Sequence, residues 1–486
     1  MPKEDIGAPP GVPAVTIRLP LLGIAAAAFV SAIACGANER MAALTAAVHD
    51  AVAATSAGSA RPKAADLRAF YAARVGAPAW VNDEAPTRHA AKALDVLRSA
   101  VDHGLSPAAY AEPELTRTFD ELTDEEKDEK APADVLARTL AQFEVRLTAS
   151  LLSLGREVAV GRGPAEPGKP GGSRRATPDL AGSLNRAAEE GKLADWLRRI
   201  QPVHPEYAAL QKALAGLQGR HGVPPPEVVA ATGAPPGRVE TSLISANLQR
   251  WRRLPDAFGD RHFLVNIPEY HLYAREQGRA ALDMKVIVGT PDNRTPVFSD
   301  EMEIVVFSPY WNIPDTIVAG ETAPAVARDP RYLARNQIEI IRASKDGVTR
   351  VQPSDVDWND PEALKQLAFR QRPGAQNALG HIKFLFPNDY NVYLHDTPAD
   401  KLFARSGRAF SHGCIRVEDP EALAKYVLRG YPEWTDEAIR EAMYSGVEKH
   451  VKLTAAIPVH IVYFTARVEP DGRLRLWRDI YSLDNK

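Results

Sequence analysis

His262-Phe263-Leu264-Val265-Asn266-Ile267 is the stretch at which the chain changes from helical to strand periodicity. It is short and apolar, with the β-branched and aromatic residues that strands favour. Similar segments follow at 269–275, 281–288 and 303–307, separated by turns such as Gln277-Gly278. We therefore expect a mostly antiparallel β-domain over residues 258–482.

The residues before this stretch have helical periodicity. From Ala64 to about Gly219, apolar side chains recur three or four positions apart, as in Leu67, Phe70 and Tyr71. We predict a helical scaffold domain over 64–257, with a proline-rich linker at 223–236. The fold class is therefore α+β, with the helical domain first.

The strand pattern of the second half is interrupted once. Residues 319–372 mix helical and polar sequence, and strands return at 381–386 and 391–394. Asp419-Pro420 then begins a helix, with aspartate as the N-cap and proline in the first turn. We interpret 319–372 as an element inserted over one face of the sheet.

Length and charge limit the class of protein. With 486 residues, of which 45% are hydrophobic, the chain is long enough for two or three domains. A formal net charge of -3 and a pI near 6.5 argue against a nucleic-acid partner, because such domains are usually basic. Two cysteines, Cys35 and Cys414, are too few to indicate a disulfide-stabilised fold.

The first 36 residues are typical of a targeting segment. The apolar run 19–34 is short for a bilayer span, which needs about 20 residues. It ends in small residues around Cys35, as in a bacterial lipoprotein signal, in which the cysteine is lipidated. An ordinary export signal or an uncleaved short anchor is the alternative, and translation from Met41 would remove the segment altogether. We predict export to the periplasm or cell envelope, with membrane attachment through lipidated Cys35, and a flexible tether at 37–63.

The most informative sequence is Ser411-His412-Gly413-Cys414-Ile415-Arg416-Val417, preceded by Tyr393-Leu394-His395-Asp396-Thr397-Pro398. A thiol needs a nearby base to become a useful nucleophile, and histidine is the usual supplier. His395 can approach Cys414 from a neighbouring strand, whereas His412 lies beside it on the same backbone. Around Gly413, which has no side chain, the backbone N–H groups can form an oxyanion hole. Arg416 is placed to meet a carboxylate.

Each of these residues has a simpler interpretation. A single cysteine in a sheet is usually a small buried hydrophobe, and a lone histidine or arginine usually has a structural role. Metal binding by His395, His412 and Cys414 is a further alternative, but there is neither a tight ligand spacing nor a fourth ligand. We therefore expect neither a metal nor a cofactor.

These motifs resemble the signature of bacterial L,D-transpeptidases. The resemblance extends to 247–255, 288–296, 308–314 and 377–386, and it is closest to the large periplasmic subgroup that has a helical scaffold. Members often carry a small peptidoglycan-binding module, for which 218–239 is too short and too rich in proline.

The resemblance implies a reaction and roles for residues. Cys414 is similar to the nucleophile that attacks a tetrapeptide stem of peptidoglycan, and the resulting thioester is resolved by a second stem to give a 3→3 cross-link. His395 is similar to the base and is oriented by the backbone carbonyl of Asp396, while Ser411, His412 and Gly413 shape the site. Weaker assignments, all to stem binding, concern Arg416, Tyr310 and Trp311. The insertion 319–372 corresponds to a capping element.

Other functions use the same residues. Hydrolysis of the thioester would give an L,D-carboxypeptidase, and free D-amino acids would give exchange. A silent protein that binds peptidoglycan stems is the alternative from another class. The sequence does not choose the acceptor.

Overall fold

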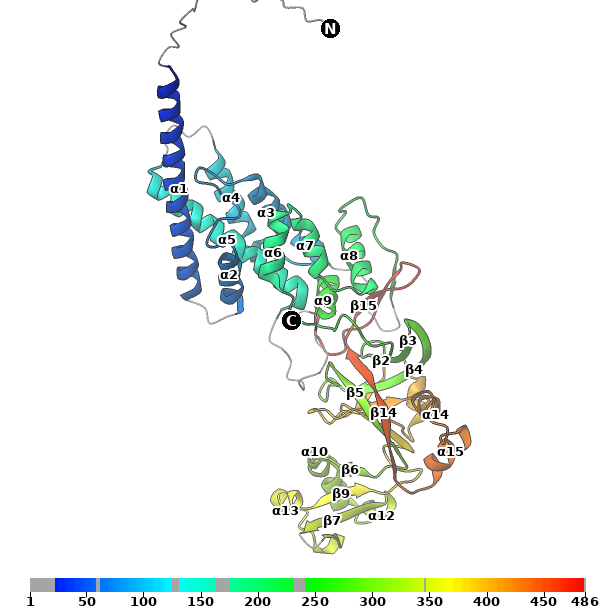
Figure 1. Cartoon of the computed structure of the whole chain (residues 1–486). Helices are drawn as coiled ribbons and strands as arrows, with labels where there is room; N and C mark the ends of the chain where they lie inside the picture. The colour runs from blue at the N-terminus through cyan, green and yellow to red at the C-terminus, as the bar shows by residue number, and fades with distance from the viewer. Residues whose placement is uncertain are drawn as a thin grey trace, which may run out of the picture. The chain divides into compact units, whose positions relative to one another are not determined.

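The computed structural model describes residues 22–57, 62–124, 131–162, 175–230, 241–344 and 347–484 (Figure 1). They form two compact units. The first comprises Met1–Arg98, Tyr110–Ser153 and Asp179–Trp196, and the second comprises Ser99–Ala109, Leu154–Pro178 and Leu197–Lys486. A helical half followed by a β-rich half confirms the predicted α+β class.

The first unit is built from helices whose buried faces carry small, aliphatic and aromatic side chains. They are α1 (Leu22–Ala57), α2 (Pro62–Ala73), α3 (Arg88–Arg98), α4 (Glu112–Thr123), most of α5 (Ala133–Val160), α6 (Leu180–Glu189) and the start of α7 (Leu193–Ile200). The tether expected at 37–63 is instead helical as far as Ala57. Leu44 and Val48 are fully buried, so α1 contributes to a packed core and is not a free linker. Among the described residues, no helix is long and apolar enough to cross a membrane.

Two helices that we expected in the scaffold belong to the second unit. Helices α8 (Pro205–Leu217) and α9 (Thr241–Trp251) share a hydrophobic core with Leu264, Phe464 and Leu474. A small sheet continues this core, in the order β1 (Val228–Ala230), β16 (Leu474–Leu476) and β15 (Ala466–Val468). Part of the predicted linker 223–236 is therefore a strand, and residues 231–240 lie outside the described part.

Nine of the described strands form the main sheet of the second unit, in the order β12-β4-β13-β11-β10-β5-β14-β2-β3. Strand β3 also pairs with β4, so all but β12 close into a ring. Their bounds are β2 Arg261–Asn266, β3 His271–Glu276, β4 Arg279–Gly289, β5 Phe298–Phe307, β10 Ile382–Leu385, β11 Leu394–His395, β12 Ala409–Ser411, β13 Ile415–Val417 and β14 Lys449–Val462. The expected antiparallel sheet is thus a closed barrel.

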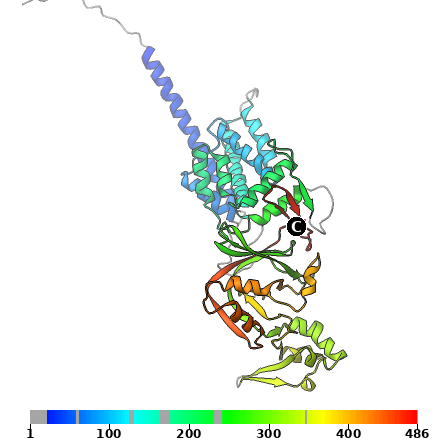
Figure 2. The ribbon, with the colours of Figure 1, turned by 90° about the vertical axis from the view of Figure 1, so that its right-hand side faces the viewer.

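The barrel mixes strand directions. The pairs β14–β2, β11–β13 and β12–β4 are parallel, and the other neighbours are antiparallel. Alternate side chains fill the interior, among them Val305, Phe384, Leu394 and Ile415, because successive residues of a strand point to opposite faces. Helices α14 (Pro420–Val427) and α15 (Asp436–Tyr444) pack against this core and appear in orange beside the strands in Figure 2. Asp419 accepts a hydrogen bond from Ala422 N and is the N-cap of α14, as predicted.

The insertion forms a small layer with its own core. Its sheet has the order β6 (Trp311–Ile313), β9 (Ala368–Gln371), β7 (Ile338–Ser344) and β8 (Gly347–Val351). Helical segments α10 (Asp315–Ile317), η3 (Val318–Thr322), α11 (Ala323–Arg328), α12 (Tyr332–Arg335) and α13 (Pro361–Lys365) lie with it (Figure 1). The inserted element therefore begins about eight residues before the expected 319, at β6. We call residues 311–371 the capping element.

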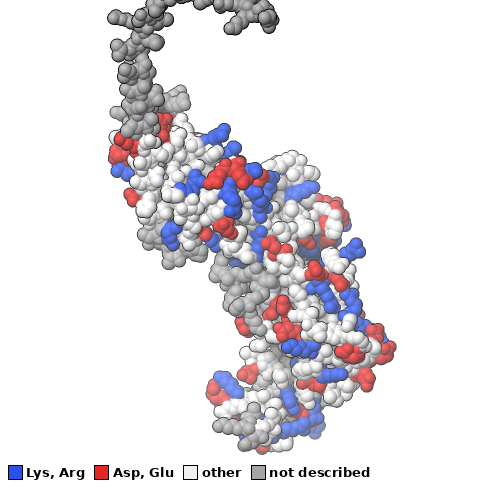
Figure 3. Space-filling model, in the orientation of Figure 1, with Lys and Arg blue, Asp and Glu red and all other residues white. Residues whose placement is uncertain are grey.

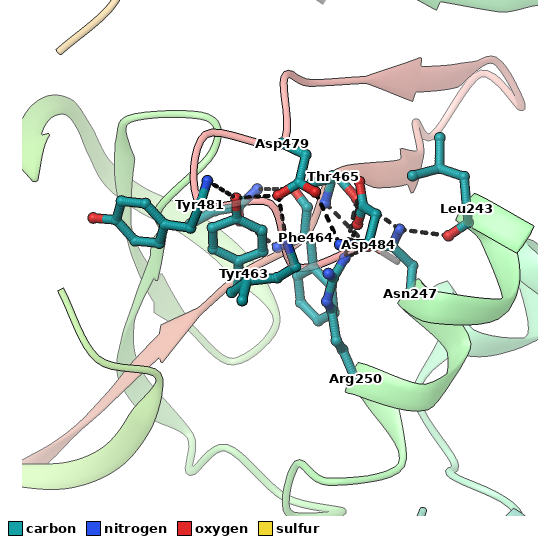
Figure 4. A network of polar contacts seen from close by, with 11 residues as sticks. Leu243, Asn247, Arg250, Tyr463, Phe464, Thr465, Asp479, Tyr481 and Asp484 are labelled. Carbon is teal, nitrogen blue, oxygen red and sulfur yellow. Dashed lines mark hydrogen bonds and ion pairs between the residues drawn. The ribbon is translucent and has the colours of Figure 1, made fainter. Parts of the chain in front are cut away.

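A polar network fixes the end of the chain to α9 (Figure 4). Asn247 and Arg250 both contact Thr465, and Arg250 pairs with Asp484 at 2.7 Å. The Tyr463 hydroxyl donates to Asp479 at 2.6 Å and accepts a hydrogen bond from Tyr481 N. This network places Tyr481 against the strand that leads to the candidate site.

On the face in Figure 3, basic and acidic side chains are interspersed.

Candidate active site

Cys414 lies in a tight loop between β12 and β13. Ser411 Oγ accepts a hydrogen bond from Gly413 N at 3.1 Å and donates to the carbonyl of Cys414 at 2.5 Å. Gly413 has a φ of +116°, a conformation that side chains rarely adopt. The Gly413 N–H, which we expected to contribute to an oxyanion hole, is therefore engaged within the loop in this state.

A second clamp comes from the C-terminal segment. The Thr295 hydroxyl accepts from Gly289 N at 2.9 Å and donates to the carbonyl of Gly413 at 2.8 Å. The Tyr481 hydroxyl accepts from Thr295 N and donates to the carbonyl of Gly289 at 2.7 Å. Sequence reasoning missed this clamp, because the three segments are far apart in the chain. All of these groups are buried, so the position of the loop is strongly determined.

His395 lies on the strand next to the cysteine loop. Strands β11 and β13 are parallel, with Leu394 opposite Ile415 and His395 opposite Arg416. Leu394 and Ile415 face the barrel interior, so the side chains on either side of them face outward. His395, Cys414 and Arg416 therefore share the outer face of the barrel.

The imidazole of His395 is held in one tautomer. Its Nδ1 lies 2.5 Å from the carbonyl oxygen of Asp396 and must carry the proton, because a carbonyl only accepts. Burial and, to a smaller extent, the charge of Arg416 lower the pKa of His395 to about 3. At neutral pH the ring is therefore uncharged, with a lone pair on Nε2.

Asp396 orients the histidine through its backbone while its side chain holds the loop. Its carboxylate accepts hydrogen bonds from His381 N at 2.7 Å and from Thr397 N at 2.6 Å. The close approach requires glycine at position 380, where a Cβ atom would lie 2.2 Å from the carboxylate. The Ala-Leu-Gly sequence before β10 is thus part of the support for His395.

The thiol of Cys414 is protonated at rest. Burial raises its pKa, and a hydrogen bond from Tyr393 only partly opposes that effect. The Sγ atom lies 3.7 Å from the carbonyl oxygen of Asn391, which can accept the S–H proton and would repel a thiolate. The resting pair is therefore thiol and neutral imidazole, so a nucleophile forms only when His395 takes the proton.

Two cations flank the histidine across the sheet. Lys383 is opposite His395 on one side in the antiparallel β10–β11 pair, and Arg416 is opposite it on the other. Desolvation lowers the pKa of Lys383 while Glu448 raises it. The buried Nε of Arg416 has no hydrogen-bond partner among the described atoms, which fits a group that awaits an anion. Lys383 was missed from the sequence, where its strand gave only an alternating pattern.

The other predicted residues make contacts in different parts of the structure. Tyr310 accepts a hydrogen bond from Lys383 through its carbonyl, and the Arg370 guanidinium lies 4.4 Å from its ring. Trp311 packs against the core of the capping element. His412 points to Glu321 of that element, at 2.7 Å. Cys35 falls within α1, but its side chain lies outside the described residues, and no group of three His, Cys, Asp or Glu among those described could hold a metal.

Comparisons with known proteins agree with this architecture. Residues 260–434 match the model of the L,D-transpeptidase catalytic domain, and residues 65–214 match that of a scaffold domain. The predicted limits were 258–482 and 64–257. A Haemophilus influenzae protein named "Putative L,D-transpeptidase" is 33% identical over 246 residues, 51% of this chain and 49% of that protein. The chain therefore spans about half the length of the curated relative it matches.

Two solved structures are similar over part of the chain. One, described as the Ldtfm-avibactam carbamoyl enzyme, is 14% identical with a TM-score of 0.19, covering 43% of this chain and 50% of its own. The other, the catalytic domain of the E. faecium L,D-transpeptidase, is 15% identical with a TM-score of 0.16, covering 42% and 96%. Residues 260–434 are thus similar to an L,D-transpeptidase catalytic domain, and residues 65–214 to a scaffold domain.

Proposed function

We propose that this chain is a peptidoglycan L,D-transpeptidase that forms 3→3 cross-links through a thioester on Cys414. The observation that carries the proposal is the placement of a neutral His395, fixed by the Asp396 carbonyl, on the strand next to Cys414. The catalytic-domain match supplies the substrate class, since the family acts on peptidoglycan stems.

The first half-reaction acylates the enzyme. His395 Nε2 takes the thiol proton as Sγ attacks the carbonyl of the diaminopimelate–D-alanine bond of a tetrapeptide stem. The tetrahedral intermediate collapses, the C–N bond breaks, and the D-alanine amine leaves with the proton from His395.

The second half-reaction transfers the acyl group. The side-chain amine of a diaminopimelate in a second stem attacks the thioester, the C–S bond breaks, and the thiol regains one proton through His395. Attack by water would give a tripeptide instead, and attack by a D-amino acid would give exchange. The buried position of His395 limits access of bulk water to the base and so supports transfer.

The peptide stem would be recognised by the two cations that flank His395, which are Lys383 and Arg416. Arg416 is suited to a stem carboxylate because its Nε is buried without a partner among the described atoms. Tyr310 lies between Lys383 and Arg370 and would contact the same stem. Trp311 has a weaker case, since it packs into the capping element.

The protein would act in the periplasm or cell envelope, with its lipid on Cys35. That proposal rests on the sequence of the first 36 residues alone. Mass analysis of the mature N-terminus tests it, because an unmodified Cys35 in the exported protein would end it.

Incubation with purified disaccharide-tetrapeptide, read by mass spectrometry, tests the function. Loss of D-alanine with formation of dimers is expected, and tripeptide monomers alone would indicate a carboxypeptidase. Cys414→Ala should give neither product, and residual activity in that variant would overturn the assignment. A carbapenem should form an adduct on Cys414, because a thiolate can open its strained ring.

A further inference from the structure

The capping element presents one carboxylate to the cysteine loop. Residues 315–328 run as α10, η3 and α11 in succession, and the middle segment is a π-helical turn. Val318 and Thr322 of this turn are buried in the capping element, while Glu321 is exposed on the opposite side. Single π turns within helices are rare and are found frequently at functional sites.

Glu321 contacts His412, and the two side chains belong to different parts of the second unit. Glu321 Oε1 lies 2.7 Å from His412 Nε2, and both side chains remain about half exposed, at 56% and 47%. Gly413, with a φ of +116°, lies between His412 and Cys414 in the loop. His412 is thus open to solvent, whereas His395 has only 4% of its surface exposed.

The proposed reaction needs a second proton acceptor. An amine that resolves the thioester arrives in water as an ammonium ion, whose lone pair is not available for attack. His395 has passed the thiol proton to the leaving amine and is neutral in the acyl-enzyme, but Lys383 and Arg416, opposite it on the neighbouring strands, repel a cation from its side. A carboxylate beside an imidazole, open to solvent, is suited both to bind an ammonium and to take one proton from it.

We propose that Glu321 and His412 form the acceptor-side site, binding the ammonium of the acyl acceptor and removing one proton from it. The inference rests on the proposed function and extends it to the acceptor. The balance is simple: the ammonium loses one proton to the pair, and the pair passes it to solvent. The free amine then forms the new amide bond, and its second proton returns to the sulfur as the C–S bond breaks.

The test separates the two half-reactions in the full chain. Acyl-enzyme formation from disaccharide-tetrapeptide is followed by intact-protein mass spectrometry. Its decay is then measured with and without a second stem as the amine acceptor, giving the rates of aminolysis and hydrolysis. Glu321→Gln keeps the shape and removes the charge, and Asp315→Asn removes an exposed carboxylate from the same helical run and is the matched control.

We expect Glu321→Gln to lower aminolysis at least tenfold more than acylation, with a higher KM for the acceptor and more tripeptide product. His412→Asn should give the same shift, and Asp315→Asn should match the wild type. An unchanged ratio of aminolysis to hydrolysis in Glu321→Gln would overturn the inference and leave the proposed function intact. An equal loss of acylation and aminolysis would place the pair on the donor side and also overturn it. No acyl-enzyme in the wild type would instead refute the proposed function.

Discussion

The helical unit and the barrel each bury a polar centre, and the two are completed differently. In the helical unit, Glu144 is fully buried, and its oxygens accept hydrogen bonds from Ala79 N and Trp80 N, both at 2.8 Å, and from the Tyr71 hydroxyl at 2.9 Å. The hydroxyl of Thr148 joins this centre by accepting from Trp80 Nε1. At the barrel, Arg416 Nε has no partner in the described region, and the Cys414 thiol has a long contact at 3.7 Å.

The difference indicates which centre supports structure and which supports chemistry. A buried polar group that lacks a partner costs about 1–3 kcal/mol, and use by a ligand or a reaction is one reason for a protein to retain it. The Glu144 centre has no such vacancy and is suited to hold α2 against α5. The barrel centre has a buried polar atom without a partner among the described residues, and this atom belongs to the strand that follows the nucleophile.

Replacing the base should have the largest effect on the reaction. His395→Gln is expected to slow acyl-enzyme formation by about 10²–10⁴-fold, the usual contribution of a general base. Circular dichroism should show an intact fold. His450→Gln, an exposed histidine on β14, serves as the control and should acylate at the wild-type rate. Near-normal acylation by His395→Gln would remove the base assignment and with it the contrast between the two centres.

The structural centre should behave in the opposite way. Glu144→Gln places amide protons against backbone N–H donors and should lower the free energy of unfolding by about 1–3 kcal/mol. Acylation per folded molecule should not change. Urea denaturation together with the acylation assay measures both quantities, and Glu114→Gln, an exposed residue of α4, is the control. Loss of acylation in folded Glu144→Gln would mean that the centre is not purely structural.

Acidification should change the contributions of the two centres to the free energy of unfolding in opposite directions. The pKa of His395 is about 3 in the folded state against 6.5 when unfolded, so its contribution to stability is complete above pH 6.5 and is lost as the pH falls. Burial raises the pKa of Glu144 from 4.5 to about 7, so its contribution grows as the pH falls through that range. At pH 5 each effect should approach about 2 kcal/mol, at 1.36 kcal/mol per pKa unit.

Denaturation at pH 7 and pH 5 measures this difference. Wild type should lose stability relative to His395→Gln on acidification and gain stability relative to Glu144→Gln. The same sign in both comparisons would show that one of the two groups titrates near its ordinary pKa.

The clamp on the cysteine loop should give the smallest effect. Thr295→Val removes the hydroxyl that joins Gly289 to Gly413 and should slow acylation about tenfold, since two buried hydrogen bonds, each worth about 0.5–1.5 kcal/mol, are lost. Thr349→Val, at an exposed position of β8, should change nothing. An unaffected rate in Thr295→Val would show that Ser411 alone positions the loop.

Local pattern was enough to predict the α+β class and the strands around the motif. Leu394 and Ile415 alternate with polar neighbours, so the outward direction of His395 and Cys414 follows from strand periodicity. The ring closure by β3 and β4 could not be predicted, because pairing between strands is a property of the whole sheet. The prediction of a tether was wrong for a related reason. An alanine-rich segment is flexible alone but becomes helical when Leu44 and Val48 pack into a core.

The site was predicted in part. The contact of His395 with the Asp396 carbonyl was expected from the resemblance, whereas Lys383 and Glu321 were not identified. Lys383 joins the site through strand register, and Glu321 through an insertion whose position relative to the motif is set only in three dimensions. Residues brought in from distant segments leave no spacing signal in the chain.

The clamp from Tyr481 through Thr295 to Gly413 can form only late in the synthesis of this region. Tyr481 follows Cys414 by 481 − 414 = 67 residues, and synthesis proceeds from the N-terminus. A growing chain therefore carries the nucleophile well before it carries the residue that fixes the nucleophile's loop. The loop is fixed only after Tyr481 has been added, so a nascent chain that stops before Tyr481 holds a thiol that is not yet positioned for attack.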